Sequence, residues 1–285
     1  MTVYQITYET QNTYSSQALE ATLEFLILPA TNNDQELLES KFDFTPVANP
    51  YRSKNIFGFD VLRFRIKNLE GGFKFSLQAT VKKDPVNPFG FKPIGLEEEK
   101  KIRESNAFII DHFPFLNFGP QTNLPVDFEF PVLGEQESVF DFVTRVSNFI
   151  HIDFTFDNSI TDPLRKLDAT IQEGKGVCQD FTHLMLAILR RNNIPCRYVS
   201  GYLNQGENIV GTGAIHAWVQ VMIPGIGWIG FDPTNNLLED HHFIKIAHGV
   251  DINDCPTLKG VIKGYGTNQT DYHVLVEEQI KDINQ

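Results

Sequence analysis

The chain has 285 residues, of which 41% are hydrophobic, and a formal net charge of −12 at neutral pH. This length suits one large domain or two ordinary domains, and we expect two. The acidic balance and the lack of a run rich in Lys and Arg argue against nucleic acid or an anionic membrane as partner, because both require clustered positive charge.

The cysteines and the N-terminal residues indicate the cellular compartment in which the protein is expected. Three cysteines are too few, and odd in number, for a complete disulfide framework, which favours a reducing environment. The opening stretch "MTVYQITYET" has neither a basic region nor an apolar core typical of a signal peptide, and no long apolar run follows it. We therefore expect a soluble, cytoplasmic protein, and the sequence leaves its oligomeric state open.

Apolar residues alternate with polar residues from Val3 to about Lys82, in stretches such as "VYQITYET", "ATLEFLILP" and "FKFSLQATV". Turn-prone breaks such as "TNND" and "EGG" separate these stretches. A period of two with turn signals is typical of strands that have one buried and one wet face. The pattern predicts a β-sandwich domain over residues 1–83.

Prolines and glycines interrupt residues 84–131, apart from a short charged turn at Leu96–Glu104, and this stretch is interpreted as a linker. A second domain is predicted over residues 132–247. It begins with apolar residues at helical spacing in "SVFDFVTRVSNF" and continues with an apolar helix that starts at Cys178. The strands "CRYVSGYL", "AIHAWVQVM" and "GWIGFDPT" follow. A helix on an antiparallel sheet gives an α+β fold class.

Cys178 follows the turn "GKGV" and opens the helix "CQDFTHLMLAILRR". The unpaired N–H groups and the dipole of a helix N-terminus stabilise a thiolate, which is the nucleophilic form of cysteine. The backbone N–H of Cys178 could also stabilise an oxyanion. The alternative is a buried cysteine that packs as a small apolar side chain.

His216 and Asp232 lie on the next two strands and could complete a catalytic group. A cysteine nucleophile needs an imidazole to take its proton and a third group to hold the ring. His216 shares a strand face with Trp218, and Asp232 ends the neighbouring strand of a hairpin, so the two side chains can lie side by side. Taken singly, a strand histidine can be structural and an Asp before Pro can be a turn former.

These stretches carry a resemblance. "GKGVCQDFTHLMLAILRRNNIPCRYVSGY" and "HAWVQVMIPGIGWIGFDPTNN" closely resemble the core of the bacterial transglutaminase-like superfamily, often described as candidate cysteine proteases, over roughly Glu135–Phe243. The strands at the N-terminus look like the β-domain that precedes this core. Residues 248–285, with "KGVIKGYGTNQTDYHVLVEE", look like the closing segment of the family. The resemblance implies a papain-like core behind a β-sandwich.

The resemblance also implies a function. Cys178 would attack a peptide or amide carbonyl, His216 would act as base and then as acid, and Asp232 would orient His216. The thioester would pass to water, as in a protease or amidase, or to an amine acceptor, and the sequence leaves this choice open. The alternative function is a catalytically inactive module that binds other proteins.

Further residues receive supporting roles. The position of Gln172, six residues before Cys178, resembles that of the oxyanion glutamine of papain-like proteases. Gln179 is expected to support the helix start, and Trp218 is expected to wall the site or to pack in the core.

The sequence predicts neither a metal nor a cofactor. Cys196 and Cys255 have no partner at metal-ligand spacing. The stretch "EDHHF" at Glu239–Phe243 could in principle bind zinc, but no C-x-x-C accompanies it. Animal transglutaminases require calcium, yet nothing here resembles an EF-hand loop.

Overall fold

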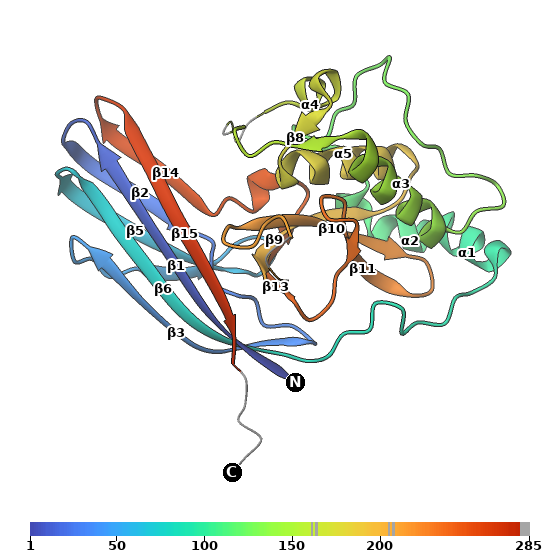
Figure 1. Cartoon of the computed structure of the whole chain (residues 1–285), viewed down its shortest axis with the longest axis horizontal. Helices are drawn as coiled ribbons and strands as arrows, with labels where there is room; N and C mark the ends of the chain where they lie inside the picture. Colours follow the sequence, from blue (N-terminus) through green and yellow to red (C-terminus); the bar gives the residue numbers. More distant parts are fainter. Residues whose placement is uncertain (161, 163–164, 205, 207–208, 280–285) are drawn as a thin grey trace, which may run out of the picture.

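The computed structural model of the chain describes residues 1–160, 162, 165–204, 206 and 209–279. Two antiparallel four-stranded sheets lie beside a second unit of helices packed on a five-stranded antiparallel sheet (Figure 1). The predicted α+β class is confirmed. The described helices include none that is both long and apolar enough to cross a membrane.

The first unit is a sandwich. One sheet has the order β15-β1-β6-β3 and the other the order β14-β2-β5-β4. The bounds of the first sheet are β1 (Thr2–Tyr14), β3 (Gln35–Thr45), β6 (Gly72–Lys83) and β15 (Asn268–Glu278). Those of the second are β2 (Ala18–Phe25), β4 (Tyr51–Lys54), β5 (Asp60–Leu69) and β14 (Leu258–Gly264).

Phenylalanine fills the space between the two sheets. Alternation along each strand directs one face inward, so every second residue of β1 from Tyr4 to Asn12 is buried. The rings of Phe25 and Phe75 stack at 4.4 Å, and so do those of Phe44 and Phe64. Such ring pairs add to the burial energy, which explains why an alternating Phe-rich sequence folds as a sandwich.

The second unit has a central sheet in the order β12-β11-β10-β9-β13. Its strands are β9 (Cys196–Leu203), β10 (His216–Ile223), β11 (Gly227–Asp232), β12 (Leu237–Leu238) and β13 (Phe243–Gly249). Its helices are α3 (Val139–Asp153), α4 (Leu167–Glu173) and α5 (Cys178–Arg191). A small parallel pair, β7 (Thr155–Phe156) and β8 (Lys175–Gly176), precedes α5.

Helix α5 is the central element of this unit. It packs on β9 and β10 and against α3 and α4, and each of its residues from Asp180 to Arg190 is buried. A helix that is covered on all sides must be apolar around its whole circumference, which accounts for the sequence "LMLAIL". Of its residues, only the first two, Cys178 and Gln179, and the last, Arg191, are not buried, so the start of the helix brings Cys178 to the surface of the core.

The segment that joins the two units contains the short helices α1 (Leu96–Arg103), α2 (Asn106–Asp111) and η1 (Phe113–Phe115). After the core, η2 (Ile252–Asp254) leads into β14 and β15, which return to the sandwich. The segment identified from the sequence as a closing segment therefore supplies one edge strand to each sandwich sheet.

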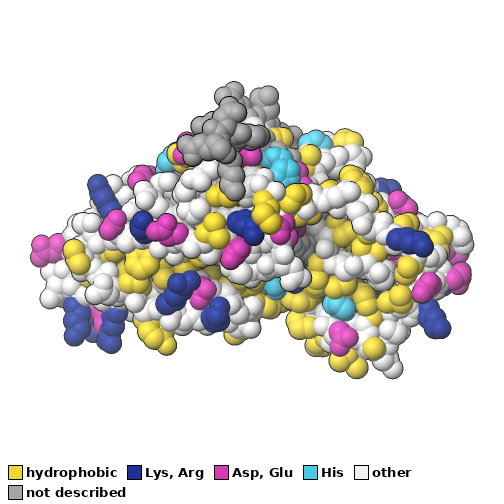
Figure 2. Space-filling model, turned by 90° about the horizontal axis from the view of Figure 1, so that it is seen from below, with side chains coloured by type: hydrophobic (Ala, Val, Ile, Leu, Met, Phe, Trp, Pro, Cys, Tyr) yellow, Lys and Arg dark blue, Asp and Glu magenta, His cyan; other side chains and the backbone are white. Residues whose placement is uncertain are grey.

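Buried hydrogen bonds join the sandwich to the core. The Tyr202 hydroxyl on β9 donates to the carbonyl of Ile27 at 2.7 Å. The amide of Gln35 on β3 donates to the carbonyl of Lys245 at 2.8 Å and accepts from its N–H at 2.9 Å. On the face shown in Figure 2, basic side chains lie next to acidic ones and do not form a separate basic patch.

Candidate active site

Cys178 occupies the first position of α5 and is half-buried. Gly174 ends α4 with a φ of 62°, a left-handed conformation that favours glycine. A Cβ on Gly176 would lie 2.8 Å from the Cβ of Asp180, so only glycine lets the chain approach the helix this closely. The Asp180 carboxylate accepts the N–H of Val177 at 2.9 Å and thereby fixes the turn that presents the thiol.

His216 begins β10 and Asp232 ends β11. The Nε2 of His216 lies 2.8 Å from Oδ2 of Asp232, and both side chains are fully buried. A carboxylate accepts hydrogen bonds, so the proton of the ring lies on Nε2 and Nδ1 is left for a second partner. The two strands that were expected to place these side chains together do so.

The Cys178 thiol is close enough to the imidazole of His216 to help raise the pKa of the ring. Among the described residues, however, no group meets full hydrogen-bond geometry with Nδ1. The thiol contact is therefore looser than the contact between Nε2 and Asp232. Looser geometry between nucleophile and base is common before a substrate binds.

The electrostatics of the group favour a charged imidazole. Burial by itself lowers the pKa of His216, but the charge of Asp232, the hydrogen bond to it and the Cys178 thiol outweigh burial and raise the pKa above its ordinary value. An imidazolium beside a thiol stabilises the thiolate. The three residues can thus hold a thiolate–imidazolium pair supported by a buried carboxylate.

Asn235 is part of this site, although the sequence did not single it out. Its Nδ2 donates to Oδ2 of Asp232 at 2.7 Å and to the carbonyl of Val210 at 2.9 Å. Its Oδ1 accepts the N–H of Val210 at 3.0 Å. Asn235 therefore holds the carboxylate of Asp232 and, at the same time, ties the loop at 209–214 to the site. The only sequence signal was its place in "DPTNN".

Gly211 is a second residue that the sequence reading missed. It has a φ of 103°, and a Cβ at this position would lie 2.4 Å from Nδ1 of His216. The loop backbone thus packs directly on Nδ1 of the imidazole. The glycines of "GTG" were visible in the sequence, but they do not indicate which side chain the loop covers.

Strand β15 brings a residue of the sandwich toward the thiol. Burial raises the pKa of Tyr272, and the charge of Cys178 adds to this increase, so the phenol lies within the electrostatic range of the thiol. Tyr272 stacks on Tyr8 with ring centroids 6.5 Å apart and is 54% exposed. Tyr272 is thus a residue of the closing segment that is close enough to the thiol to sense its charge.

The supporting residues lie at different places. Gln172 is exposed on α4, and Gln179 is half-buried in the first turn of α5. Trp218 is fully buried on β10, and its ring meets that of Phe243 at 5.3 Å. Gly201 makes room for it, since a Cβ there would lie 2.4 Å from the indole. Trp218 packs in the core beneath His216, and the roles of the two glutamines stay predictions.

The two other thiols are buried. Burial raises the pKa of Cys196 to about 11, and burial followed by the charge of Asp254 raises that of Cys255 still further. Both thiols are therefore inert at neutral pH.

Comparison with known protein families places this geometry in context. Residues 127–233, which include all three residues of the group, match the transglutaminase-like superfamily. The chain contains a transglutaminase-like domain. This domain comprises the helix and the strands that position Cys178, His216 and Asp232.

Relatives extend the likeness beyond this domain. An uncharacterised protein of Mycobacterium leprae is 27% identical over 96% of this chain and 97% of its own length. An uncharacterised protein of Mycobacterium tuberculosis is 37% identical over 40% of this chain and 39% of its own length. A candidate cysteine protease from Cytophaga hutchinsonii, known from its crystal structure, aligns with 99% of this chain and 92% of its own, at 22% identity and a TM-score of 0.73. The sandwich and the transglutaminase-like core thus occur together in that fold.

Proposed function

We propose that this protein is a cysteine-dependent enzyme that processes peptide or amide substrates through a thioester on Cys178. The observation that carries the proposal is the buried contact of 2.8 Å between His216 and Asp232, together with a half-buried thiol at a helix N-terminus whose charge acts on the imidazole. Burying a charged pair costs free energy, and such pairs are frequent at functional sites. Here the pair lies beside a potential nucleophile, the thiol of Cys178.

The first half of the reaction forms the thioester. The thiolate of Cys178 attacks the carbonyl carbon, and its electron pair forms the C–S bond while the carbonyl oxygen becomes an oxyanion. The backbone N–H of Cys178, which no helical carbonyl accepts at the first position of α5, is available to this oxyanion. His216 then gives its Nδ1 proton to the leaving amine as the C–N bond breaks.

The second half releases the acyl group. His216, now neutral at Nδ1, takes a proton from water or from an amine acceptor, which attacks the thioester carbonyl. The C–S bond breaks, and the thiolate is restored beside the imidazolium. Asp232 keeps its charge throughout and holds the ring through Nε2. Water gives hydrolysis, and an amine gives acyl transfer.

The test compares single variants on a fluorogenic peptide amide, with and without an added primary amine. We expect Cys178→Ala and His216→Ala to lose essentially all turnover and Asp232→Asn to reduce it by roughly 10³-fold or more, because the ring is no longer held. Cys255→Ala, a buried thiol outside the group, is the matched control and should keep its activity. Circular dichroism checks the fold of each variant.

A labelling experiment separates the chemistry from the choice of substrate. Iodoacetamide at pH 7 should modify Cys178 ahead of Cys196 and Cys255, and His216→Ala should slow this labelling, as measured by peptide mass spectrometry. Equal labelling of the three thiols, or turnover that survives in Cys178→Ala, would contradict the proposal. Selective labelling without turnover of any acyl substrate would favour the inactive binding module instead.

A further inference from the structure

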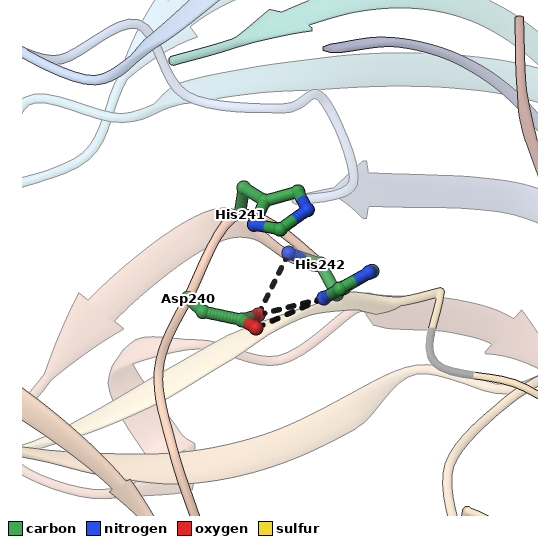
Figure 3. Close-up of side chains that lie close together, drawn as sticks. All are labelled: Asp240, His241 and His242. Carbon is green, nitrogen blue, oxygen red and sulfur yellow. Dashed lines mark hydrogen bonds and ion pairs between the residues drawn. The ribbon is translucent and has the colours of Figure 1, made fainter. Parts of the chain in front are cut away.

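The turn between β12 and β13 brings three potential metal ligands together. Asp240, His241 and His242 are each half-buried, and one ligand atom from each lies within 4.8 Å of the others. Figure 3 shows the Asp240 carboxylate facing the ring of His242, with the ring of His241 standing above them. None of the three residues belongs to the catalytic group.

Backbone contacts fix this turn in place. The N–H of His242 donates to Oδ1 of Asp240 at 2.9 Å, and the N–H of Phe243 donates to the carbonyl of Asp240 at 3.2 Å. The N–H of Asn204 donates to the carbonyl of His242 at 3.1 Å. The side chains are therefore held close together before any ligand arrives, which reduces the entropy that binding must overcome.

The side chains offer nitrogen and oxygen atoms to a common point. Nδ1 of His242 lies 3.0 Å and 2.9 Å from the two carboxylate oxygens of Asp240, so a proton is shared there. The rings of His241 and His242 are 4.0 Å apart at an angle of 36°. A metal ion can replace the shared proton, and it requires both imidazoles in their neutral forms.

Among the described residues, the ion pairs of Asp240 involve only His242. Burial, followed by the charges of Glu278 and Asp240, raises the pKa of Tyr4 on β1. The Tyr4 hydroxyl is buried and meets no partner with full hydrogen-bond geometry in the described part of the chain. A cation held by Asp240 would offset the charge that acts on the Tyr4 hydroxyl.

We propose that Asp240, His241 and His242 bind a divalent transition-metal ion of the zinc class, with water completing the coordination. Two imidazole nitrogens and one carboxylate oxygen suit zinc, whereas calcium and magnesium prefer oxygen ligands alone. The sequence argued against zinc because no C-x-x-C is present, but imidazole and carboxylate groups are sufficient ligands.

The test uses the full chain with Cys178→Ala, so that the half-buried thiol cannot act as a competing ligand. After treatment with a chelator, the protein is titrated with Co²⁺, whose visible absorption reports nitrogen and oxygen ligands, and then with Zn²⁺ by calorimetry. We expect one equivalent of Co²⁺, displaced by Zn²⁺, and binding that weakens as the pH falls below about 6.5, where free imidazole takes up a proton. Saturating Zn²⁺ should also raise the Tm.

Variants in the same background decide the assignment. His241→Ala and His242→Ala should each weaken binding by at least about tenfold, which is the low end for loss of a group that supports a metal. His273→Ala, which removes an exposed histidine of β15, is the matched control and should bind as before. If His242→Ala does not fold, His241→Ala decides the result. Absence of binding at one equivalent, or unchanged affinity in His241→Ala, would overturn the proposal.

Discussion

Asn235 shows how one side chain can link a catalytic carboxylate to a covering loop. Its amide meets Asp232 and both polar groups of the Val210 backbone. The carboxylate also accepts backbone N–H groups from Thr234 and Asn235. These hydrogen bonds to the oxygen atoms of Asp232 compensate for the loss of water around the fully buried carboxylate.

We therefore expect Asn235→Ala to lower kcat by about 10- to 100-fold with little change in KM, because a hydrogen bond to a charged group contributes about 1.5–3 kcal/mol. Asn236→Gly is the matched control, since Asn236 is exposed and has a φ of 52° that glycine adopts without strain. Steady-state kinetics on the peptide amide measure both variants. A larger loss of kcat in Asn236→Gly than in Asn235→Ala would show that Asn235 does not position Asp232.

At this scale the sequence revealed the residues that have distinctive chemistry. Cys178, His216 and Asp232 lie on a helix start and on the ends of neighbouring strands, and such places can be located from periodicity. Asn235 could not be found in this way, because an asparagine after "DPT" is first of all a turn residue. Its contact with Val210 depends on how a distant loop folds back, and no local pattern encodes that contact.

The covering loop is the element that most directly limits the site. Residues 209–214 lie between β9 and β10, with left-handed glycines at Gly211 and Gly213. The two glycines differ in what surrounds them. A Cβ on Gly211 would clash with the imidazole of His216, whereas a Cβ on Gly213 would have the Val274 carbonyl oxygen as its nearest neighbour at 3.8 Å.

Gly211→Ala is therefore expected to abolish most turnover, because the imidazole or the loop must move. Gly213→Ala, the matched control, carries a similar backbone strain of roughly 1 kcal/mol at its positive φ but no clash, so turnover should be largely kept. Turnover and thermal unfolding, measured on both variants, separate the clash from the strain. Equal loss of activity in the two variants would mean that the loop acts only through its stability.

Among the elements, the long strands of the N-terminal stretch (β1, β2, β3, β5 and β6) and helix α5 could be predicted because their periods are regular. The joining segment was harder to interpret: its short charged turn at Leu96–Glu104 corresponds to α1, whereas the six residues of α2 gave no clear period. Ser105 caps α2 by accepting the N–H of Phe108, but a cap on a helix of six residues is a weak signal in a sequence.

At the scale of the whole molecule, His248 marks the junction of three parts of the chain. Its ring lies 4.8 Å from that of Phe59 in the sandwich and 6.0 Å from that of Phe115 in the joining segment. Burial, together with the charges of Lys245 and Arg197, lowers the pKa of His248 to about 2. The ring is therefore neutral in the folded protein at every pH of practical interest.

This makes the stability of the protein sensitive to acid. Above the ordinary histidine pKa of about 6.5 neither state holds the proton, whereas below it only the unfolded state binds one, so stability falls as the pH decreases from 6.5 toward 2. We expect the free energy of unfolding to decline by at most about 1.4 kcal/mol per pH unit from this residue. Urea unfolding of His248→Gln at pH 7 and pH 5 should show a smaller decline than in the parent protein. An identical decline would rule out His248 as a source.

The order of strands in the sandwich also has a consequence for how the polypeptide is made. The strands β14 and β15 form the edges of the two sandwich sheets but leave the ribosome only after the whole transglutaminase-like core. At ordinary rates of translation the first six strands wait roughly ten seconds or more with exposed edges, which are prone to pair with other chains. The core can fold first, and β14 and β15 then complete the sandwich, whose first strands were synthesised at the start.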